Sequence, residues 1–350
     1  MSKSQIATGG IADDAVTTAK TSYSAFPFRN LIINGDMSQA QRGTQTTGIG
    51  ASDGYFTVDR FQYTKEGSPS ARFTMRQDST VPTGQGFASS LKMDCTTAQG
   101  SLSAGDGFNI QQKIEAQNLQ LLRYGTSSAK TLILSFWVRA AKAGTNVVWI
   151  YQNDDARSQA QSYTISSADT WEKKTLTFAA DTTGVIDNNN GEGFRISWWL
   201  GAGTNFTSGT LATTWESHTS ANNAVGQVNH ADTSGNDFYL TGVQLEVGTS
   251  ASDFEFLPYD VNLNRCLRYY QDFDDFILWT TALDGNTTDR LGGSISFPVP
   301  MREAPSVSST NNTGTIENNY SRVFGYSVFA TKSSRGTTTN LQDMEFDAEL

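Results

Sequence analysis

The histidines of this sequence are the residues with which it could bind a metal. His218 and His230 stand twelve positions apart, which is wider than the tight spacing by which histidine pairs usually hold zinc. Glu216 and Asp232 lie close to them in sequence. A surface zinc site is therefore one interpretation, and solvated loop residues are the other. We favour the second interpretation and predict no metal site.

The acidic residues are candidates for glycoside hydrolysis, which needs two carboxyl groups at a set separation. With 35 acidic residues, pairs arise by chance, and none stands in a recognisable catalytic setting. The sequence also has no Gly-x-Ser-x-Gly elbow and no phosphate-binding loop. We therefore expect a protein that is not an enzyme and has no catalytic residues. The candidate carboxylates are Asp154, Asp155, Asp187, Glu192, Glu216, Asp272, Asp274 and Asp275.

Aromatic rings are better candidates for binding, because a flat ring packs against the apolar face of a sugar while amide and charged side chains bind its hydroxyl groups. Trp198 and Trp199 are adjacent in a predicted strand and must face opposite sides. The phase of Phe194 and Ile196 places Trp198 in the core. Trp199 then faces outward, where it contacts a ligand or packs beneath a loop or a neighbouring subunit. The predicted ligand-binding residues are Trp149, Tyr151, Trp199 and Trp215.

Strands are the elements that must position these rings. Apolar residues alternate along 132–138, where Leu132, Leu134, Phe136 and Val138 share one face, and this pattern is typical of a strand with one buried side. The same period recurs at 147–151, 176–178, 194–200 and 238–247. Its phase slips at Gly242, which predicts a bulge or a bend. Short helices are predicted within 111–124 and 264–270.

The segment 201–236 differs from the strands around it. It is rich in Gly, Thr, Ser and Asn, and it is longer than the structureless loops that compact domains usually contain. Long loops of this kind often carry function. Trp215 lies within it, and either ligand contact or packing explains an aromatic ring there.

Composition agrees with a chain of many short strands. Charged residues make up 17% of the 350 residues, aromatic residues 11%, and there are 31 glycines, which favours turns and argues against disorder. The net charge of −10 disfavours nucleic acid and anionic membranes as partners. The sequence shows neither a secretory signal nor an apolar run long enough to insert into a membrane, so we expect synthesis in a cytoplasm without classical export.

The chain divides into three predicted parts. Residues 1–26 are small and polar, with Ile6, Ile11 and Val16 at intervals that fit neither a helix nor a strand. They form either a disordered tail or an attachment and oligomerisation segment, and we predict the latter. Residues 27–260 form the main strand-rich domain, and residues 261–350 form a smaller β module. Cys95 and Cys266 are far apart in sequence, and we expect buried free thiols.

Several blocks of the sequence resemble bacteriophage tail-fibre and virion-surface proteins. The segment 10–20 (GIADDAVTTAK) is similar to segments that precede trimeric fibre domains. The other blocks touch most of the chain, and their order is more specific than any one of them. They are 30–36 (NLIINGD) with 41–43 (QRG), 136–140 (FWVRA), 171–174 (WEKK), 238–248 (FYLTGVQLEVG), 254–259 (FEFLPY), 266–271 (CLRYYQ), 297–302 (FPVPMR) and 347–350 (DAEL).

This resemblance implies an all-β fold: an antiparallel jelly-roll sandwich close to carbohydrate-binding modules, with an extended N-terminal segment and a smaller C-terminal β module. It implies a homotrimeric virion protein, a tail-fibre subunit, that contacts other virion proteins through residues 1–26 and binds host-surface glycan or envelope for adsorption. The alternatives are a capsid-decorating or head-fibre protein without a ligand, and a glycan-depolymerising tailspike.

Related carbohydrate-binding modules often use an aspartate on the last strand to hold a structural calcium ion. In this sequence the equivalent stretch, 240–243, reads LTGV and contains no carboxylate. Asp36 and Asp237 only flank the expected position, and a calcium ion needs six to eight oxygen ligands. We therefore predict no cofactor.

Overall fold

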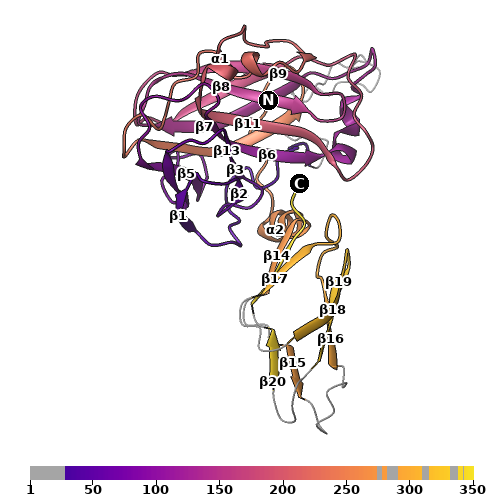
Figure 1. The fold of residues 1–350 in the computed structure, drawn as a ribbon. Helices are drawn as coiled ribbons and strands as arrows, with labels where there is room; N and C mark the ends of the chain where they lie inside the picture. The colour runs from indigo at the N-terminus through magenta and orange to yellow at the C-terminus, as the bar shows by residue number, and fades with distance from the viewer. Residues whose placement is uncertain (1–27, 274–277, 282–290, 310–314, 332–337, 342) are drawn as a thin grey trace, which may run out of the picture.

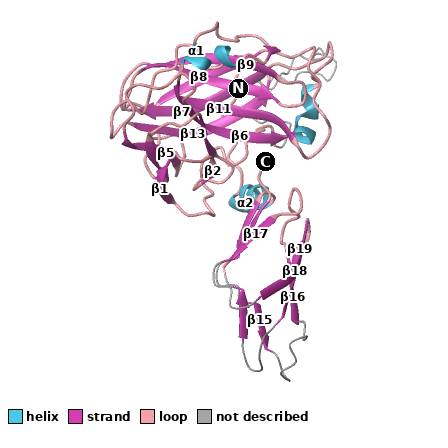
Figure 2. Cartoon of the chain, viewed as in Figure 1, coloured by secondary structure: helices cyan, strands magenta, loops and turns pink. Residues whose placement is uncertain are grey.

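The computed structural model describes residues 28–273, 278–281, 291–309, 315–331, 338–341 and 343–350, so the predicted attachment segment 1–26 lies outside the described residues. The larger part of the molecule is the predicted antiparallel jelly-roll sandwich (Figures 1 and 2). One sheet has, in spatial order, β1 (Gln45–Ile49), β4 (Arg72–Asp78), β5 (Ser90–Thr97), β13 (Asp237–Val247), β7 (Leu132–Ala140) and β10 (Glu172–Phe178). The other has β12 (Glu216–Ser217), β9 (Arg157–Ile165), β8 (Gly144–Gln152), β11 (Glu192–Ala202), β6 (Gly107–Glu115), β3 (Gln62–Glu66) and β2 (Gly54–Tyr55).

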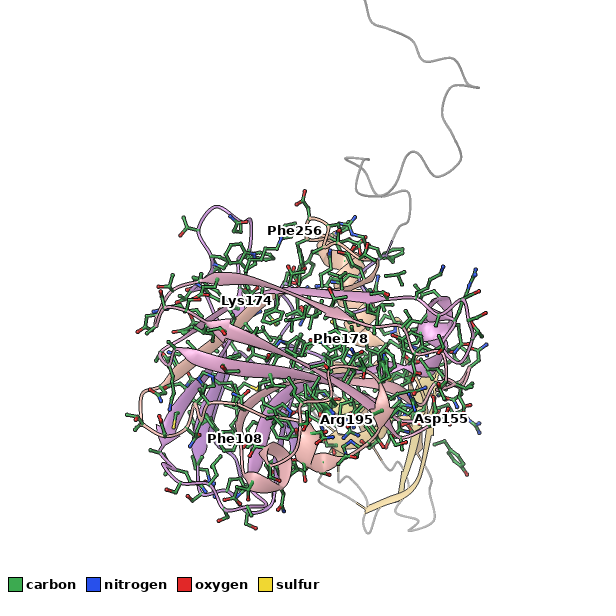
Figure 3. The ribbon with its side chains drawn as sticks, turned by 90° about the horizontal axis from the view of Figure 1, so that it is seen from above. Phe108, Asp155, Lys174, Phe178, Arg195 and Phe256 are labelled. Atoms are coloured by element: carbon green, nitrogen blue, oxygen red, sulfur yellow. The ribbon has the colours of Figure 1, made fainter. Side chains whose placement is uncertain are left out.

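The main core lies between these two sheets. Alternate residues of each strand point into it, and among them Trp198, Phe136 and Phe178 are completely buried (Figure 3 labels Phe178 in the interior). The rings of Phe136 and Trp198 meet edge to face at 5.9 Å. Both cysteines are free and buried, as predicted.

The predicted irregularity at Gly242 is confirmed. The pairing of β13 with β7 shifts register between Thr241 and Gln244, and Gly242 has a φ of 60°. A Cβ atom there would come within 2.6 Å of the Phe87 ring, so glycine is required both by the backbone conformation and by the close approach.

The helices are short. The prediction for 111–124 is wrong in its first part, because residues up to Glu115 continue β6, whose edges are hydrogen-bonded to β11 and β3; only Ala116–Leu122 form a 3₁₀ helix, η1. The helix predicted at 264–270 is confirmed in part: residues 264–267 are the end of α2 (Tyr259–Leu267), whereas Tyr270 begins the strand β14 (Tyr270–Phe273). The other helices among the described residues are α1 (Thr204–Thr207) and η2 (Ser220–Asn222). None of the helices among the described residues has the length and apolarity needed to cross a bilayer.

The described residues from Tyr270 onward form a narrow arm below the sandwich, with α2 beside the junction (Figure 1); we call this arm the distal module. Its small core includes Phe297, Met301 and Phe346. Its strands form three small antiparallel sheets: β14 (Tyr270–Phe273), β21 (Met344–Asp347) and β17 (Ser306–Ser309); β15 (Leu278–Thr281) and β20 (Thr338–Leu341); and β16 (Leu291–Ser296), β19 (Gly325–Thr331) and β18 (Thr315–Arg322).

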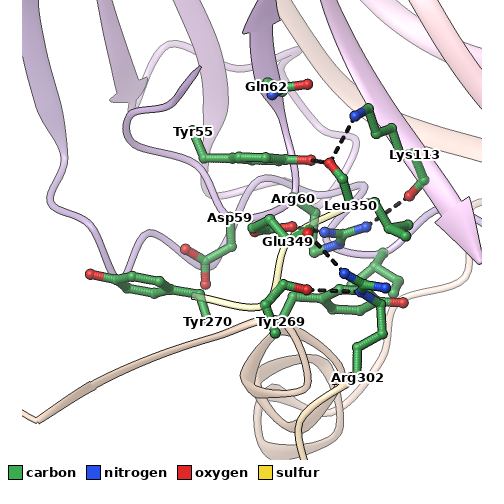
Figure 4. A network of polar contacts seen from close by, with 12 residues as sticks. Tyr55, Asp59, Arg60, Gln62, Lys113, Tyr269, Tyr270, Arg302, Glu349 and Leu350 are labelled. Atoms are coloured by element: carbon green, nitrogen blue, oxygen red, sulfur yellow. Dashed lines mark hydrogen bonds and ion pairs between the residues drawn. The ribbon is translucent and has the colours of Figure 1, made fainter. Parts of the chain in front are cut away.

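Buried charges join the sandwich to the distal module and to the two residues before it, Arg268 and Tyr269 (Figure 4). The Glu115 side chain is completely buried and accepts hydrogen bonds from Arg268 Nε at 2.7 Å and from the Tyr269 hydroxyl at 2.6 Å. Burial alone would raise the pKa of Glu115, but these bonds outweigh it and the pKa is lowered. Nearby, the Arg60 guanidinium lies 3.5 Å from the centre of the Tyr269 ring and pairs with Glu349.

Acid should destabilise the sandwich through His230. This buried ring approaches Asn146 Oδ1 at 2.6 Å and packs on Phe238. Burial, with a smaller contribution from Lys142, lowers its pKa from 6.5 to about 4. As the pH falls, His230 is protonated near pH 6.5 in the unfolded chain but only near pH 4 in the folded chain. Protonation therefore favours unfolding in this range, and the free energy of unfolding falls between pH 6.5 and 4 by up to about 3 kcal/mol. Urea unfolding at pH 7 and pH 4.5 measures this loss, and a His230→Gln variant should show a smaller one. An equal loss in the variant would contradict the assignment.

Candidate functional site

A groove of about 450 Å³ runs over the outer face of the seven-stranded sheet. Its lining side chains come from β3, β6, β8 and β11, and from the segment 201–236 that covers one side. In each of these strands the neighbouring residues point into the main core, because successive side chains alternate across a sheet. The pattern that builds the core therefore also builds the groove on the opposite face.

One wall of the groove is aromatic. Trp149 and Tyr151 are two positions apart on β8 and stack with ring centres 5.4 Å apart. Trp199 of β11 lies 6.5 Å from Trp149, and Phe206 of α1 lies 5.3 Å from Trp199. Trp149 and Trp199 are 7% and 2% exposed, so they form the base of the wall, whereas Tyr151 and Phe206 are half-buried and keep surface for a ligand.

The opposite wall consists of amide and hydroxyl groups held in fixed orientations. Gln111 Nε2 donates to Gln62 Oε1 at 2.6 Å, and Thr64 Oγ1 donates to Asn109 Oδ1 at 2.9 Å. Gln111 of β6 lies directly opposite Gln62 on one side and Ser197 on the other, and Ser197 lies opposite Trp149. The strand register therefore places this wall and the aromatic wall on one continuous row across the sheet.

Charged groups lie together at one end of the groove. Arg195 of β11 is paired across the sheet with Tyr151 on one side and Lys113 on the other. Its guanidinium donates to both Glu192 carboxylate oxygens, at 2.9 and 3.2 Å, and Lys113 Nζ lies 3.3 Å from the same carboxylate. Burial lowers the pKa of Lys113, and the Glu192 carboxylate opposes this shift only in part.

His218 completes the aromatic wall from the covering segment. Its ring lies 5.6 Å from Trp149 and 5.1 Å from Tyr151, and its backbone N–H donates to Ala156 O at 2.8 Å. Burial and the positive charge of Arg195 lower its pKa below 6.5, so the imidazole is neutral at pH 7.

Three of the four sequence-predicted residues meet in this groove: Trp149, Tyr151 and Trp199. As predicted, Trp198 belongs to the main core and Trp199 faces away from it. The covering segment 201–236 contributes Phe206, His218, Ser220 and Asn223 to the lining.

The structure does not bring Trp215 to the groove. Its ring packs against the main core, stacked on Phe194 at 5.8 Å and edge-on to Tyr124 at 5.6 Å. Its Nε1–H donates to Ala179 O at 2.6 Å. Of the two interpretations that the sequence left open for this residue, its contacts are those of packing.

Sequence reasoning missed the polar residues of the groove, Arg195 and Gln111 among them. They alternate with core residues on β11 and β6, and this signal marks them as facing outward. It does not show that β6, β8 and β11 are neighbours, which is what brings these residues to one site. Among the described residues, no group of three or more His, Cys, Asp and Glu side chains is placed to hold a metal ion. Asp36 accepts hydrogen bonds from Ser38 and Asn262, whereas Asp237 pairs with Lys92.

No protein-family model and no curated protein matches this sequence. Solved structures with partial similarity include the enzymatically active domain of bacteriophage CBA120 tailspike protein 4, at 13% identity and a TM-score of 0.34, covering 64% of this chain and 22% of that one. A putative sugar binding protein from Bacteroides thetaiotaomicron is 14% identical with a TM-score of 0.33, covering 63% of this chain and 100% of that one. The family 11 carbohydrate-binding module of a Clostridium thermocellum cellulase is 13% identical with a TM-score of 0.31, covering 59% and 98%.

The environment of His218 predicts how its ring titrates. We expect an apparent pKa below 6.5, because burial and Arg195 both disfavour the charged imidazole. In an Arg195→Gln variant the pKa should rise, because the neighbouring positive charge is removed. A proton NMR titration of the ring signals measures both values, with His230 as the internal reference. A pKa of His218 that does not respond to Arg195→Gln would show that the two side chains are not neighbours in solution.

Proposed function

We propose that this chain is a virion surface protein, a homotrimeric tail-fibre subunit, whose groove binds host-surface glycan during adsorption. The observation that carries the proposal is the pairing of the two walls: aromatic rings face fixed amide groups across one groove. A sugar ring has an apolar face and a rim of hydroxyl groups, so this pairing matches its chemistry. The volume of about 450 Å³ lies in the range of small-ligand sites.

The half-buried rings set how such a ligand would lie. Tyr151 and Phe206 offer partly exposed faces, and Trp149 and Trp199 hold them from beneath. The groups best placed to meet the hydroxyls are the half-buried Gln62 and Thr64. Their hydrogen bonds to Gln111 and Asn109, which are only 3% and 4% exposed, fix them before binding and so reduce the entropy lost on association.

Binding without catalysis is part of the proposal. Two carboxylates at the groove are held by other groups: Glu192 by Arg195 and Lys113, and Asp53 by the backbone N–H of Lys65 at 2.8 Å. Glu66 also lines the groove, where its side chain is exposed. Two carboxyl groups facing each other across the groove would be needed for hydrolysis. Incubation with the bound glycan should leave its chain length unchanged.

Trimerisation would increase the avidity of a weak single groove, because the second and third contacts of one fibre are intramolecular. The distal module has a small core of its own and exposes the Phe324 side chain, 72% accessible, at the turn between β18 and β19. Small modules of this kind commonly gain stability from neighbouring copies. Residues 1–26 would hold the fibre on the particle.

The Tyr151→Ala variant tests the groove. We expect an affinity loss of roughly tenfold for the bound glycan, about 1.4 kcal/mol, because the ring that packs on the sugar is removed. A glycan array identifies the ligand and calorimetry measures the affinity. Tyr259→Ala is the matched control, because Tyr259 is 68% exposed and does not line the groove.

Two outcomes would contradict the proposal. Equal affinities of the Tyr151 and Tyr259 variants would place the glycan outside this groove. Electron microscopy of the intact particle addresses the virion role: three copies around one tail axis would agree with a fibre, whereas density spread over the capsid lattice would replace adhesion by capsid decoration.

A further inference from the structure

The last residues of the distal module lie against the strand that carries the groove's amide wall (Figure 4). Lys113 of β6 lines the groove, and its Nζ donates to the backbone oxygen of Leu350 at 2.8 Å. The Tyr55 hydroxyl approaches the same oxygen at 3.5 Å. A groove residue is thus held directly by the distal module.

From Lys113 a series of contacts continues to the aromatic wall. Lys113 Nζ is 3.3 Å from the Glu192 carboxylate, which accepts two hydrogen bonds from Arg195. The Arg195 guanidinium lies 5.7 Å from the centre of the Tyr151 ring, the half-buried ring of the wall. Each member of the series Leu350, Lys113, Glu192, Arg195, Tyr151 contacts the next.

A second route reaches Glu192 through Arg302 of the distal module. Arg302 Nη1 donates to Asn190 O at 3.0 Å, and Asn190 Nδ2 donates to Arg302 O at 2.9 Å, two residues before Glu192. Arg302 also holds the end of the chain segment that meets Lys113, because its Nε donates to Ala348 O at 2.8 Å and its Nη2 to Glu349 O at 3.0 Å. One side chain therefore holds the backbone beside two members of the series, Leu350 and Glu192.

The backbone of Lys113 is anchored as well. Arg60 is 1% exposed, donates to Lys113 O at 2.7 Å and pairs with Glu349 of the distal module. A lysine side chain is long and flexible, and holding it in one conformation costs conformational entropy. The Leu350 oxygen of the distal module restrains the Lys113 ammonium group before any ligand binds, so less of this entropy is lost on binding.

We propose that the distal module completes the glycan groove: its segment 347–350 and Arg302 position Lys113, Glu192 and Arg195 for the ligand, so that ligand affinity and the docking of the distal module are coupled. This inference rests on the proposed glycan-binding function. Coupling of this kind is reciprocal, so a ligand in the groove must also stabilise the junction.

The Arg302→Met variant tests the inference with the glycan that the array identifies. Arg302 does not line the groove, yet its loss frees the segment 347–350 and the loop before Glu192. We expect the affinity measured by calorimetry to fall by about fivefold or more, the lower end of typical coupling between sites. Arg322→Met is the matched control: this exposed arginine at the end of β18 lies in the same module, and its variant should bind like the natural chain.

Hydrogen exchange separates positioning from simple stabilisation. The Ala348 N–H donates to Tyr269 O at 2.8 Å and reports on the junction. Adding glycan should slow its exchange in the natural chain and have a smaller effect in Arg302→Met. A purely structural role for Arg302 would lower the melting temperature while leaving both the affinity and the effect of glycan on Ala348 unchanged, and that result would overturn the inference.

If Arg302→Met does not fold, Tyr55→Phe serves instead, because it removes only the hydroxyl that approaches Leu350. Like Arg302→Met, the Tyr55→Phe variant should bind glycan with lower affinity than the natural chain. The two proposals fail differently: a natural chain that binds no glycan refutes the proposed function, whereas glycan binding with unchanged affinity in both junction variants refutes only the coupling.

Discussion

The structure depends on one constraint: consecutive side chains of β11 point to opposite faces of the sheet. Trp198 is fully buried between the sheets, and Trp199 lies beneath the groove on the other face. A slip of one residue in the pairing of β11 would exchange them and would also bring Arg195 into the apolar core, where an unpaired charge is very costly. The core thus fixes the register, and the register fixes which side chains line the groove.

This constraint explains how much the sequence could predict. Alternation within one strand is local, so it identified β7, β8, β10, β11 and β13, the core side of Trp198, the irregularity at Gly242 and three groove aromatics. The pairing of strands, in contrast, is not determined by the sequence within any one strand. Arg195 meets Tyr151 only because β11 pairs with β8, and Gln111 meets Gln62 only because β6 pairs with β3. Such pairings require tertiary structure, so the polar half of the site could not be predicted.

The segment 201–236 shows a second limit. Its length and composition indicated a functional loop, and it does bring Phe206 and His218 to the groove. The same composition says nothing about which of its aromatic rings points inward. Trp215 has the polar sequence neighbours of an exposed residue. In the structure, however, its indole N–H donates a hydrogen bond to Ala179 O and its ring stacks on Phe194, so it packs against the core. Residues 111–115 make the same point: a helical pattern of apolar residues gave way to a strand with hydrogen-bonded neighbours on both edges.

The junction between the sandwich and the distal module contains charged pairs, although apolar packing alone could hold two modules together. Burying Arg60 with Glu349, and burying Glu115 against the partly exposed Arg268, costs desolvation energy that the pairing only partly offsets, so these pairs contribute little to net stability. These pairs do fix the orientation of the distal module relative to the sandwich. Each guanidinium binds its acceptors in one orientation, whereas two apolar surfaces can shift relative to each other. A groove that shares Lys113 with the junction needs the distal module in one position. Charged contacts therefore suit this junction better than a larger apolar interface of equal stability would.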